Sequence, residues 1–189
     1  MYIHLKRCLD FVMALVGMIL LSPLFLILMI AIKLDSKGPI LFRQKRIGIH
    51  KTHFHILKFR TMRIDTPKDM PTHLLQNPEQ YITKVGKFLR KTSLDELPQL
   101  FNVLKGEMTL VGPRPPLPSE VAHYTSYEEM RLSVTPGLTC VWQVQPKRDE
   151  IRFADWVDMD LKYIGTRSIW LDLWLVFRTV LVVIRSSGS

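Results

Sequence analysis

The chain has 189 residues, of which 47% are hydrophobic and 23% charged, and its formal net charge at pH 7 is +9. This length favours one domain plus an attachment segment, with a core that needs no disulfide or metal to stabilise it. The positive charge indicates a negatively charged partner, for which nucleic acid, anionic lipid and a phosphorylated substrate all qualify. The two cysteines, Cys8 and Cys140, fit no metal-binding or redox spacing, so we expect both to stay reduced.

Residues 11–32 form an apolar run of 22 residues without a charged side chain. A continuous helix of this length would reach about 33 Å, which is enough to cross the core of a bilayer. A signal peptide is the first alternative, because Lys6 and Arg7 precede the run. The run is longer than a typical signal core, however, and it ends without a small-residue cleavage site. We therefore predict a segment that stays in the membrane.

Ser22 and Pro23 interrupt the middle of this run. Proline removes a helical hydrogen bond and clashes with the preceding turn, which leaves two halves of about 16 Å, or half a bilayer each. Cations flank both ends, so the positive-inside tendency places both ends in the cytoplasm. These features favour a re-entrant helix that enters and leaves by one face, ahead of a kinked spanning helix, in which proline is also tolerated. We assign residues 1–36 to this re-entrant segment and residues 37–189 to a cytosolic domain.

Short strands and a loop are expected next. Residues 39–42 follow a turn and read as a short strand, and residues 52–59 alternate well enough for a second strand. Residues 65–78 contain three prolines and many polar side chains, which indicates a loop. The cytosolic domain therefore begins with a small β-sheet.

Helical spacing dominates the middle of the chain. Apolar side chains between residues 81 and 105 predict two helices, separated near Thr92 and Ser93. Residues 112–118 cannot be regular, because four of the seven are proline. Residues 120–133 are a further helix candidate.

The last elements are a short strand and an apolar helix. Residues 135–145 turn at Pro136 and Gly137 and then read as a short strand. Residues 170–184 are densely apolar but marginal in length for a spanning helix. Tryptophans on such a segment suit the membrane interface, although a buried core helix fits equally well. The expected fold is α+β: a mainly helical domain with a small sheet, the re-entrant helix and interfacial amphipathic helices.

Asp95 and Glu96 are the first candidates for chemistry. The ordinary interpretation is that Ser93 and Glu96 form a capping box at the start of an amphipathic helix. The same position in the first turn favours ionised carboxylates, because it is the positive end of the helix dipole. Asp95 could then act as a nucleophile or a metal ligand, with Glu96 taking the other role.

Cations on constrained segments surround this acidic pair in the sequence. Arg90 precedes it, and Arg114 lies between two prolines, where the backbone can barely move. Lys58 and Arg60 alternate with Phe59 and could share one face of a strand. Each alone could be a solvated surface charge, but together they indicate a phosphate-rich ligand. The carboxylates suggest that a metal accompanies it.

Four stretches together resemble a known family. The chain resembles the bacterial sugar transferases known as monotopic phosphoglycosyl transferases. The matching stretches cover well over half of the chain in family order, and they are KRCLDFVMALVGMILLSPLFLILMIAIKLDSKGPILFRQKRIG, KFRTM, VGKFLRKTSLDELPQLFNVLKGEMTLVGPRP and PGLTCVWQV.

The resemblance implies a reaction and its site. Such enzymes transfer a sugar phosphate from a UDP-sugar to a membrane polyprenol phosphate, release UMP and require Mg2+. By this resemblance Asp95 would be the nucleophile that forms a covalent aspartyl phosphosugar, and Glu96 would bind Mg2+. Arg90 and Arg114 would bind the phosphates. Lys58 and Arg60 remain phosphate-binding candidates from the residues themselves.

The resemblance also implies a location. The Ser-Pro break of the family's re-entrant helix falls on Ser22 and Pro23, and its basic pair, expected at the lipid headgroups, falls on Lys6 and Arg7. The enzyme would then work at the cytoplasmic face of the bacterial inner membrane, in contact with anionic lipid. A homo-oligomer is compatible with this arrangement.

Two departures and two alternatives accompany this interpretation. The family commonly follows its WQV with serine, glycine and arginine, whereas this chain has Gln145, Pro146, Lys147 and Arg148. Many relatives carry several spanning helices ahead of this domain. No such helices are evident ahead of residue 11 here, so we expect this chain to correspond to the catalytic unit alone. A membrane-tethered nucleic-acid-binding protein is disfavoured, because no base-reading motif is present. A non-catalytic scaffold for glycan assembly would tolerate loss of the acidic pair, which this chain retains.

Overall fold

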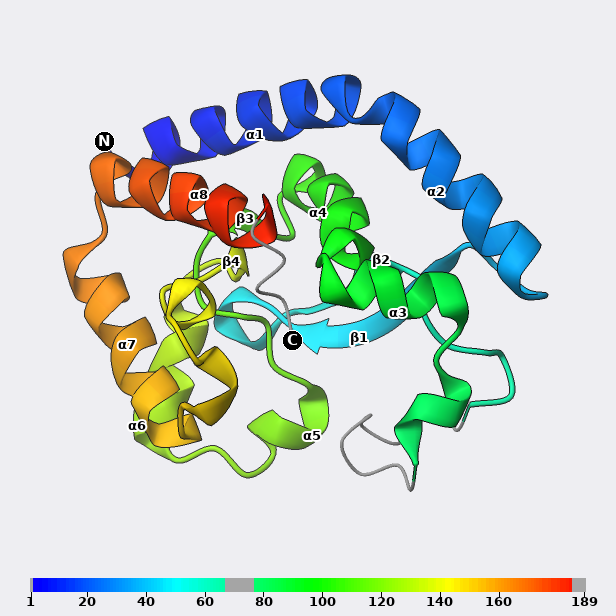
Figure 1. Cartoon of the computed structure of the whole chain (residues 1–189). Helices are drawn as coiled ribbons and strands as arrows, with labels where there is room; N and C mark the ends of the chain where they lie inside the picture. The colour runs from blue at the N-terminus through cyan, green and yellow to red at the C-terminus, as the bar shows by residue number, and fades with distance from the viewer. Residues whose placement is uncertain (1, 67–76, 185–189) are drawn as a thin grey trace.

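The computed structural model describes residues 2–66 and 77–184 and has an α+β fold, as predicted (Figure 1). Two small two-stranded sheets lie among the helices of the described residues. In chain order the main elements are α1 (Tyr2–Leu20), α2 (Ser22–Asp35), β1 (Leu41–Ile47), β2 (His53–Phe59), α3 (Lys84–Lys91), the 3-10 helix η4 (Leu94–Gln99), α4 (Leu100–Lys105), β3 (Thr109–Val111), α5 (Pro118–Val121), α6 (Ser126–Glu129), the 3-10 helix η5 (Met130–Ser133), β4 (Gly137–Thr139), the 3-10 helix η6 (Trp142–Val144), α7 (Phe153–Thr166) and α8 (Ile169–Ile184).

The apolar N-terminal segment is a bent pair of helices that arches over α8 and α4 (Figure 1). The axes of α1 and α2 differ by 62°, and Pro23 lies at the start of α2, where its missing N–H breaks no helical bond. The Ser22 hydroxyl donates to the Ile19 carbonyl at 2.8 Å on the other side of the break. The predicted break at Ser22 and Pro23 is thus confirmed. In the described part of the chain no single helix is long and apolar enough to cross a membrane. Taken together, α1 and α2 have the length and composition of a candidate membrane segment, either a broken span or a re-entrant loop.

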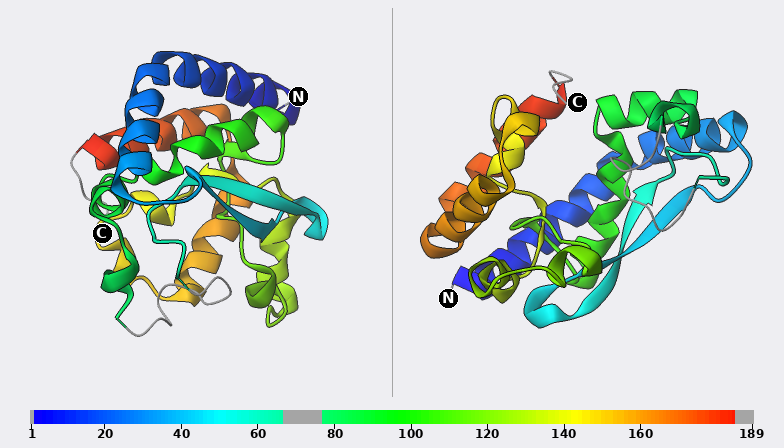
Figure 2. Two further views of the ribbon diagram at one scale, coloured as in Figure 1. Left: turned by 90° about the vertical axis from the view of Figure 1, so that its right-hand side faces the viewer. Right: turned by 90° about the horizontal axis from the view of Figure 1, so that it is seen from below.

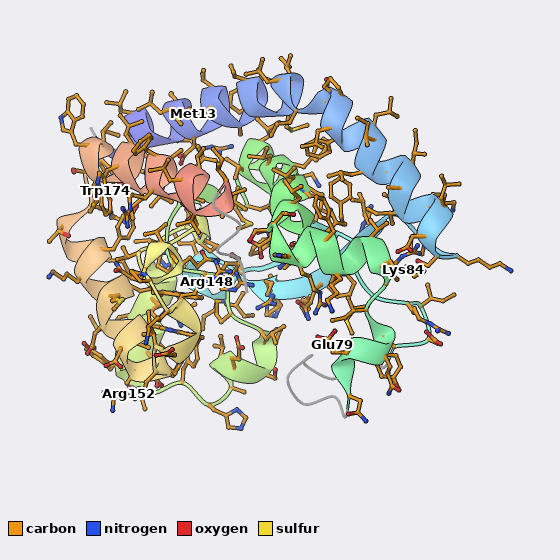
Figure 3. The ribbon with its side chains drawn as sticks, in the orientation of Figure 1. Met13, Glu79, Lys84, Arg148, Arg152 and Trp174 are labelled. Atoms are coloured by element: carbon orange, nitrogen blue, oxygen red, sulfur yellow. The ribbon has the colours of Figure 1, made fainter. Side chains whose placement is uncertain are left out.

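One side of the arch packs on the rest of the protein and the other is exposed. Ala14 is fully buried in the main core, and Leu28 and Ile32 are buried beside Phe59 and Leu89 in a second cluster. Side chains project outward along the whole arch in Figure 3. Large apolar residues that are at least 40% exposed on it are Ile3, Leu5, Phe11, Val12, Leu15, Val16, Ile19, Leu20, Leu26, Ile27, Ile30 and Leu34.

The basic pair that precedes the apolar run binds protein groups. The Lys6 ammonium lies 2.9 Å from a carboxylate oxygen of Asp172 in α8 and 3.4 Å from Asp10. The Arg7 guanidinium donates to the carbonyls of Val103 and Leu104 at the end of α4. Both cations thus have protein partners while remaining only partly buried, and their contact with lipid headgroups stays a prediction.

The two sheets differ in direction and in position. β1 and β2 are antiparallel, with Leu41 paired to Phe59 and Ile47 to His53. The second strand was predicted correctly, but the first begins at Leu41 rather than at residue 39 and continues to Ile47. A strand can continue through this basic stretch because alternate side chains point to solvent, as Arg43 does. β3 and β4 are parallel, with Thr109 paired to Gly137 and Val111 to Thr139.

The predicted helices are confirmed with two corrections. The separation near Thr92 and Ser93 is present, but the second helix begins as the 3-10 helix η4 before α4 follows. The helix expected over residues 120–133 is broken into α5, α6 and η5. It breaks because Thr125 and Glu128 form a capping box that starts a new helix. Most of the predicted loop 65–78 lies outside the described residues.

Helix α8 confirms the predicted C-terminal helix. Leu175 is fully buried, and the Asp172 carboxylate accepts hydrogen bonds from the Tyr2 and Tyr163 hydroxyls. Trp170 is 82% exposed and Trp174 50% exposed on the same helix. A helix buried on all sides is therefore excluded, and the placement of its exposed side at a membrane interface stays a prediction.

Candidate active site

The acidic pair occupies the first turn of η4, which packs against β2. Ser93 has φ of 56° and makes no side-chain cap, so the predicted capping box with Glu96 is wrong. Ser93 instead forms a left-handed turn between α3 and η4, and the Glu96 side chain contacts Lys58 of β2. Asp95 is only 9% exposed. Both carboxylates thus lie in a partly buried site between η4 and β2.

Two cations from other elements converge on Glu96. The Lys58 ammonium, from β2, donates to Glu96 Oε1 at 2.6 Å and lies 3.8 Å from Asp95 Oδ2. The Arg114 guanidinium reaches the same Glu96 oxygen at 3.5 Å. Four residues predicted from the sequence are therefore together in the structure: Lys58, Asp95, Glu96 and Arg114.

The two carboxylates have opposite electrostatic environments. Burial raises the pKa of Asp95 above its ordinary value, although the Lys58 charge opposes this rise. Burial would raise the pKa of Glu96 as well, but Lys58 and Arg114 hold it well below its ordinary value. Glu96 is consequently a fixed anion that suits a cation, whereas Asp95 is the more basic oxygen donor, as a nucleophile should be.

Arg114 is held by a close approach between two backbone segments. The Gly112 amide donates to the Thr139 carbonyl at 3.0 Å, and the Gly137 amide donates to the Pro113 carbonyl at 2.9 Å. A Cβ on Gly137 would lie only 2.1 Å from the Gly112 nitrogen. Residues 112–117 are irregular, as predicted. This clamp fixes the loop that presents Arg114.

Arg90 and Arg60 have different surroundings. Arg90, from α3, donates from Nε to the Thr61 hydroxyl at 2.9 Å, and its charge acts on Asp95. The Arg60 guanidinium donates to the carbonyls of Ser36 and Lys37, where it caps the end of α2. The expectation that Arg60 shares a face with Lys58 at the phosphate site is therefore corrected. The strand ends at Phe59, so the alternation does not continue to Arg60.

Sequence reasoning missed Arg46 and Gln99. The site contains a pocket to which both residues contribute, and Gln99 is only 4% exposed. Extending the first strand to Ile47 would have revealed Arg46, because alternation puts it on the face of Lys58. The lining residues of this pocket are Arg46, Ile56, Lys58, Gln99, Arg114, Pro115, Gly137 and Leu138.

The donor set fits a magnesium ion shared with a phosphorylated ligand. The described residues contain no group of three or more His, Cys, Asp or Glu side chains that could enclose a metal. Mg2+ usually binds through one or two carboxylates, with substrate phosphates and water completing its shell. Asp95 and Glu96 supply such a pair, and Glu96 keeps one oxygen beyond the one bound by Lys58 and Arg114.

Three relatives show how this chain compares with longer proteins. CpsE, a galactosyl transferase of Streptococcus agalactiae serotype III (strain NEM316), is 40% identical over 202 residues, which cover all of this chain and 44% of CpsE. The exopolysaccharide production protein ExoY of Sinorhizobium fredii (strain NBRC 101917 / NGR234) is 39% identical, over 97% of this chain and 87% of ExoY. The UDP-glucose:undecaprenyl-phosphate glucose-1-phosphate transferase of Escherichia coli (strain K12) is 41% identical, over 93% of this chain and 39% of that protein.

The chain thus spans less than half the length of two of these relatives and most of the third. A family model described as bacterial sugar transferase matches residues 1–186. This match takes in the bent helix pair, the acidic pair and the loop that presents Arg114. The protein therefore belongs to the bacterial sugar transferase family, in agreement with the resemblance found in its sequence.

Proposed function

We propose that this protein transfers a sugar 1-phosphate from a UDP-sugar to a membrane polyprenol phosphate. The products are UMP and a polyprenol-diphosphate sugar, which would begin the assembly of a bacterial surface glycan such as an exopolysaccharide or capsule. The observation that carries the proposal is the carboxylate pair of Asp95 and Glu96 in contact with Lys58 and Arg114. Relatives named for undecaprenyl-phosphate sugar transfer support the same substrates.

The site's residues have distinct roles in this reaction. Asp95 would attack the sugar-bearing phosphorus to form an aspartyl phosphosugar. The positive charge of Arg90 favours the ionised form of the Asp95 carboxylate. Glu96 would hold Mg2+, which when bound offsets the negative charge of the diphosphate. Lys58 and Arg114 would contact phosphate oxygens, for which a rigid guanidinium is suited. The same site would then pass the phosphosugar to the polyprenol phosphate, so donor and acceptor need not bind together.

The bent pair of α1 and α2 would insert into the cytoplasmic leaflet as a re-entrant helix. Its outer side carries large exposed apolar residues, and its two halves meet at a 62° bend, as the proposed re-entrant arrangement requires. Transfer of a fully exposed large apolar side chain out of water is favourable by about 1.5–3 kcal/mol. The side chains of the arch are partly exposed, so each contributes a share of that free energy, and together they favour burial in lipid. The protein would then lie on the cytoplasmic face of the inner membrane, where a polyprenol phosphate presents its headgroup.

The decisive experiment follows UMP release. Purified protein in lipid nanodiscs is incubated with Mg2+, undecaprenyl phosphate and a panel of UDP-sugars. We expect UMP from at least one UDP-sugar, dependent on the polyprenol phosphate for repeated turnover and suppressed by a chelator. If no UDP-sugar in a broad panel gives UMP release, and circular dichroism shows that the protein is folded, the proposal is contradicted.

A further inference from the structure

Arg46 lies in the site pocket with one unused hydrogen-bond donor. Its guanidinium donates to the Pro115 carbonyl at 3.0 Å and to the Gln44 side-chain oxygen at 2.7 Å. Its Nε atom is buried and has no acceptor among the described residues. Both acceptors are uncharged, so neither hydrogen bond pairs Arg46 with a carboxylate, and Glu120 and Glu96 act on its charge only through space. A buried donor without an acceptor carries a free-energy cost that a bound ligand could remove.

Arg46 also faces a second guanidinium. Burial and, after it, the charge of Arg114 lower the pKa of Arg46 to about 10. At neutral pH both side chains are still protonated, so two like charges share one pocket. Such an arrangement is stabilised when an anion lies between them, and a phosphate matches the planar fork of a guanidinium.

The neighbouring charges place Arg46 relative to the acidic pair. Asp95 is affected most by Lys58, Glu96, Arg90 and Arg114. Arg46 is affected most by Arg114, followed by Glu120 and Glu96. Arg114 is thus shared. The strand register separates Arg46 from the acidic pair, because Lys58 is paired with Phe42 and Arg46 lies four residues further along the same face of β1. The pocket lined by Arg46, Lys58 and Arg114 does not have Asp95 among its lining residues.

We propose that Arg46, together with Arg114, binds the nucleotide-side phosphate of the donor and stabilises UMP as it leaves. The inference rests on the proposed function. In that step a bond forms between an Asp95 carboxylate oxygen and the sugar-bearing phosphorus. The bond from this phosphorus to the bridging oxygen breaks, and its electron pair stays on the oxygen, which departs as part of the UMP phosphate. The departing phosphate gains negative charge, which the two guanidinium groups compensate.

A purely structural role for Arg46 makes a different prediction. If Arg46 serves only to hold the Pro115 carbonyl, its loss should weaken every ligand of the site together with the stability of the fold. If it binds a phosphate, its loss should weaken only ligands that carry one. A comparison of UMP with uridine therefore separates the two roles without requiring turnover.

The test measures binding of UMP and of uridine by isothermal titration calorimetry, with Mg2+ present. Arg46→Gln should weaken the binding of UMP by roughly 10-fold or more, which is the usual contribution of a charged hydrogen bond. It should leave the affinity for uridine unchanged. Arg46→Lys keeps the positive charge but loses the planar guanidinium, so its affinity for UMP should lie between those of wild type and Arg46→Gln. The matched control is Arg43→Gln, three residues earlier on the exposed face of the same strand, which should bind both ligands as wild type does.

Equal weakening of UMP and uridine, or unchanged UMP binding in both Arg46 variants, would overturn the inference. Thermal unfolding identifies a variant that does not fold, and Arg46→Lys then carries the test. A turnover arm separates this inference from the proposed function. There, Arg46→Lys should raise KM for the UDP-sugar and leave KM for undecaprenyl phosphate unchanged. Absence of turnover in wild type, with phosphate-selective binding that depends on Arg46, would reject the transfer reaction and retain the phosphate site.

Discussion

Lys58 and Arg60 are two residues apart, and only Lys58 reaches the acidic pair. Alternation would have placed both on one face, but β2 ends at Phe59 and Arg60 turns to the carbonyls of Ser36 and Lys37. The residues and the family resemblance together singled out Lys58, Asp95, Glu96 and Arg114, which the structure brings together, and their roles stay predictions. The need of α2 for a cation at its C-terminal end is a tertiary property, which a local pattern does not contain.

Asp95→Asn tests the nucleophile directly. The amide has nearly the same shape as the carboxylate but lacks its nucleophilic oxygen, so we expect UMP release to fall at least about 1,000-fold. Wild-type protein incubated with UDP-sugar alone should gain the mass of one phosphosugar on the peptide that contains Asp95. The variant should show no such adduct.

The control for this variant is Asp65→Asn. Asp65 pairs with Arg63 on the surface, where its side chain is 54% exposed, and its substitution should leave turnover unchanged. Substantial turnover of Asp95→Asn, or an adduct on another residue, would remove Asp95 from the role of nucleophile.

Among the elements, the sequence predicted those whose pattern is local. The β2 strand, the break at Pro23 and the helix α8 each follow from alternation, proline chemistry or dense apolarity. The single helix expected over residues 120–133 failed, because helical spacing of apolar residues continues across a capping box. Thr125 and Glu128 do carry a local signal for that boundary, and it should have been given more weight.

The close contact between β3 and β4 predicts a large effect of a small change. A Cβ on Gly137 would meet the Gly112 nitrogen at 2.1 Å and its carbonyl oxygen at 2.5 Å, and backbone atoms cannot move aside as a side chain can. Gly137→Ala should therefore lower the free energy of unfolding by about 1–3 kcal/mol. It should also reduce turnover, because the loop that carries Arg114 shifts.

Gly165 in α7 is the matched control. A Cβ there meets nothing within 4 Å, and alanine restricts the unfolded chain and suits a helix better than glycine. Gly165→Ala should raise stability by about 0.5–1 kcal/mol and leave turnover unchanged. Thermal unfolding in the same nanodiscs compares the two variants. If Gly137→Ala and wild type have the same free energy of unfolding, the two backbone segments can move apart without cost, and the prediction is wrong.

At the scale of the whole molecule, α1 and α8 run beside each other along one side of the protein (Figures 1 and 2). Asp172 of α8 binds Lys6 and Tyr2 of α1, and Ala14 of α1 and Leu175 of α8 are buried in the same hydrophobic cluster. Met13 marks α1 and Trp174 marks the neighbouring α8 in Figure 3. The exposed apolar residues of both helices would therefore enter the same lipid leaflet. This pairing joins the two ends of the chain and has no signature in a local sequence pattern.

The re-entrant arrangement predicts that both ends of the bent pair face the cytoplasm. In a Cys8→Ser background, single cysteines at the exposed positions His4 and Lys37 are treated in intact cells with a thiol reagent that cannot cross the inner membrane. Both should be protected in intact cells and labelled after the membrane is opened, whereas buried Cys140 should stay unlabelled. Labelling of only one of the two positions in intact cells would show that the segment spans.

The buried side of α1 has a consequence for how this protein can be varied. Ala14 is part of the main core, and Arg7 satisfies the last carbonyls of α4. An anchor that served only as a tether could be exchanged for a lipid chain or an unrelated spanning helix. Here such a graft would restore attachment but leave a gap in the core and remove the donor that Arg7 supplies to the end of α4, so membrane attachment and folding could not be engineered separately.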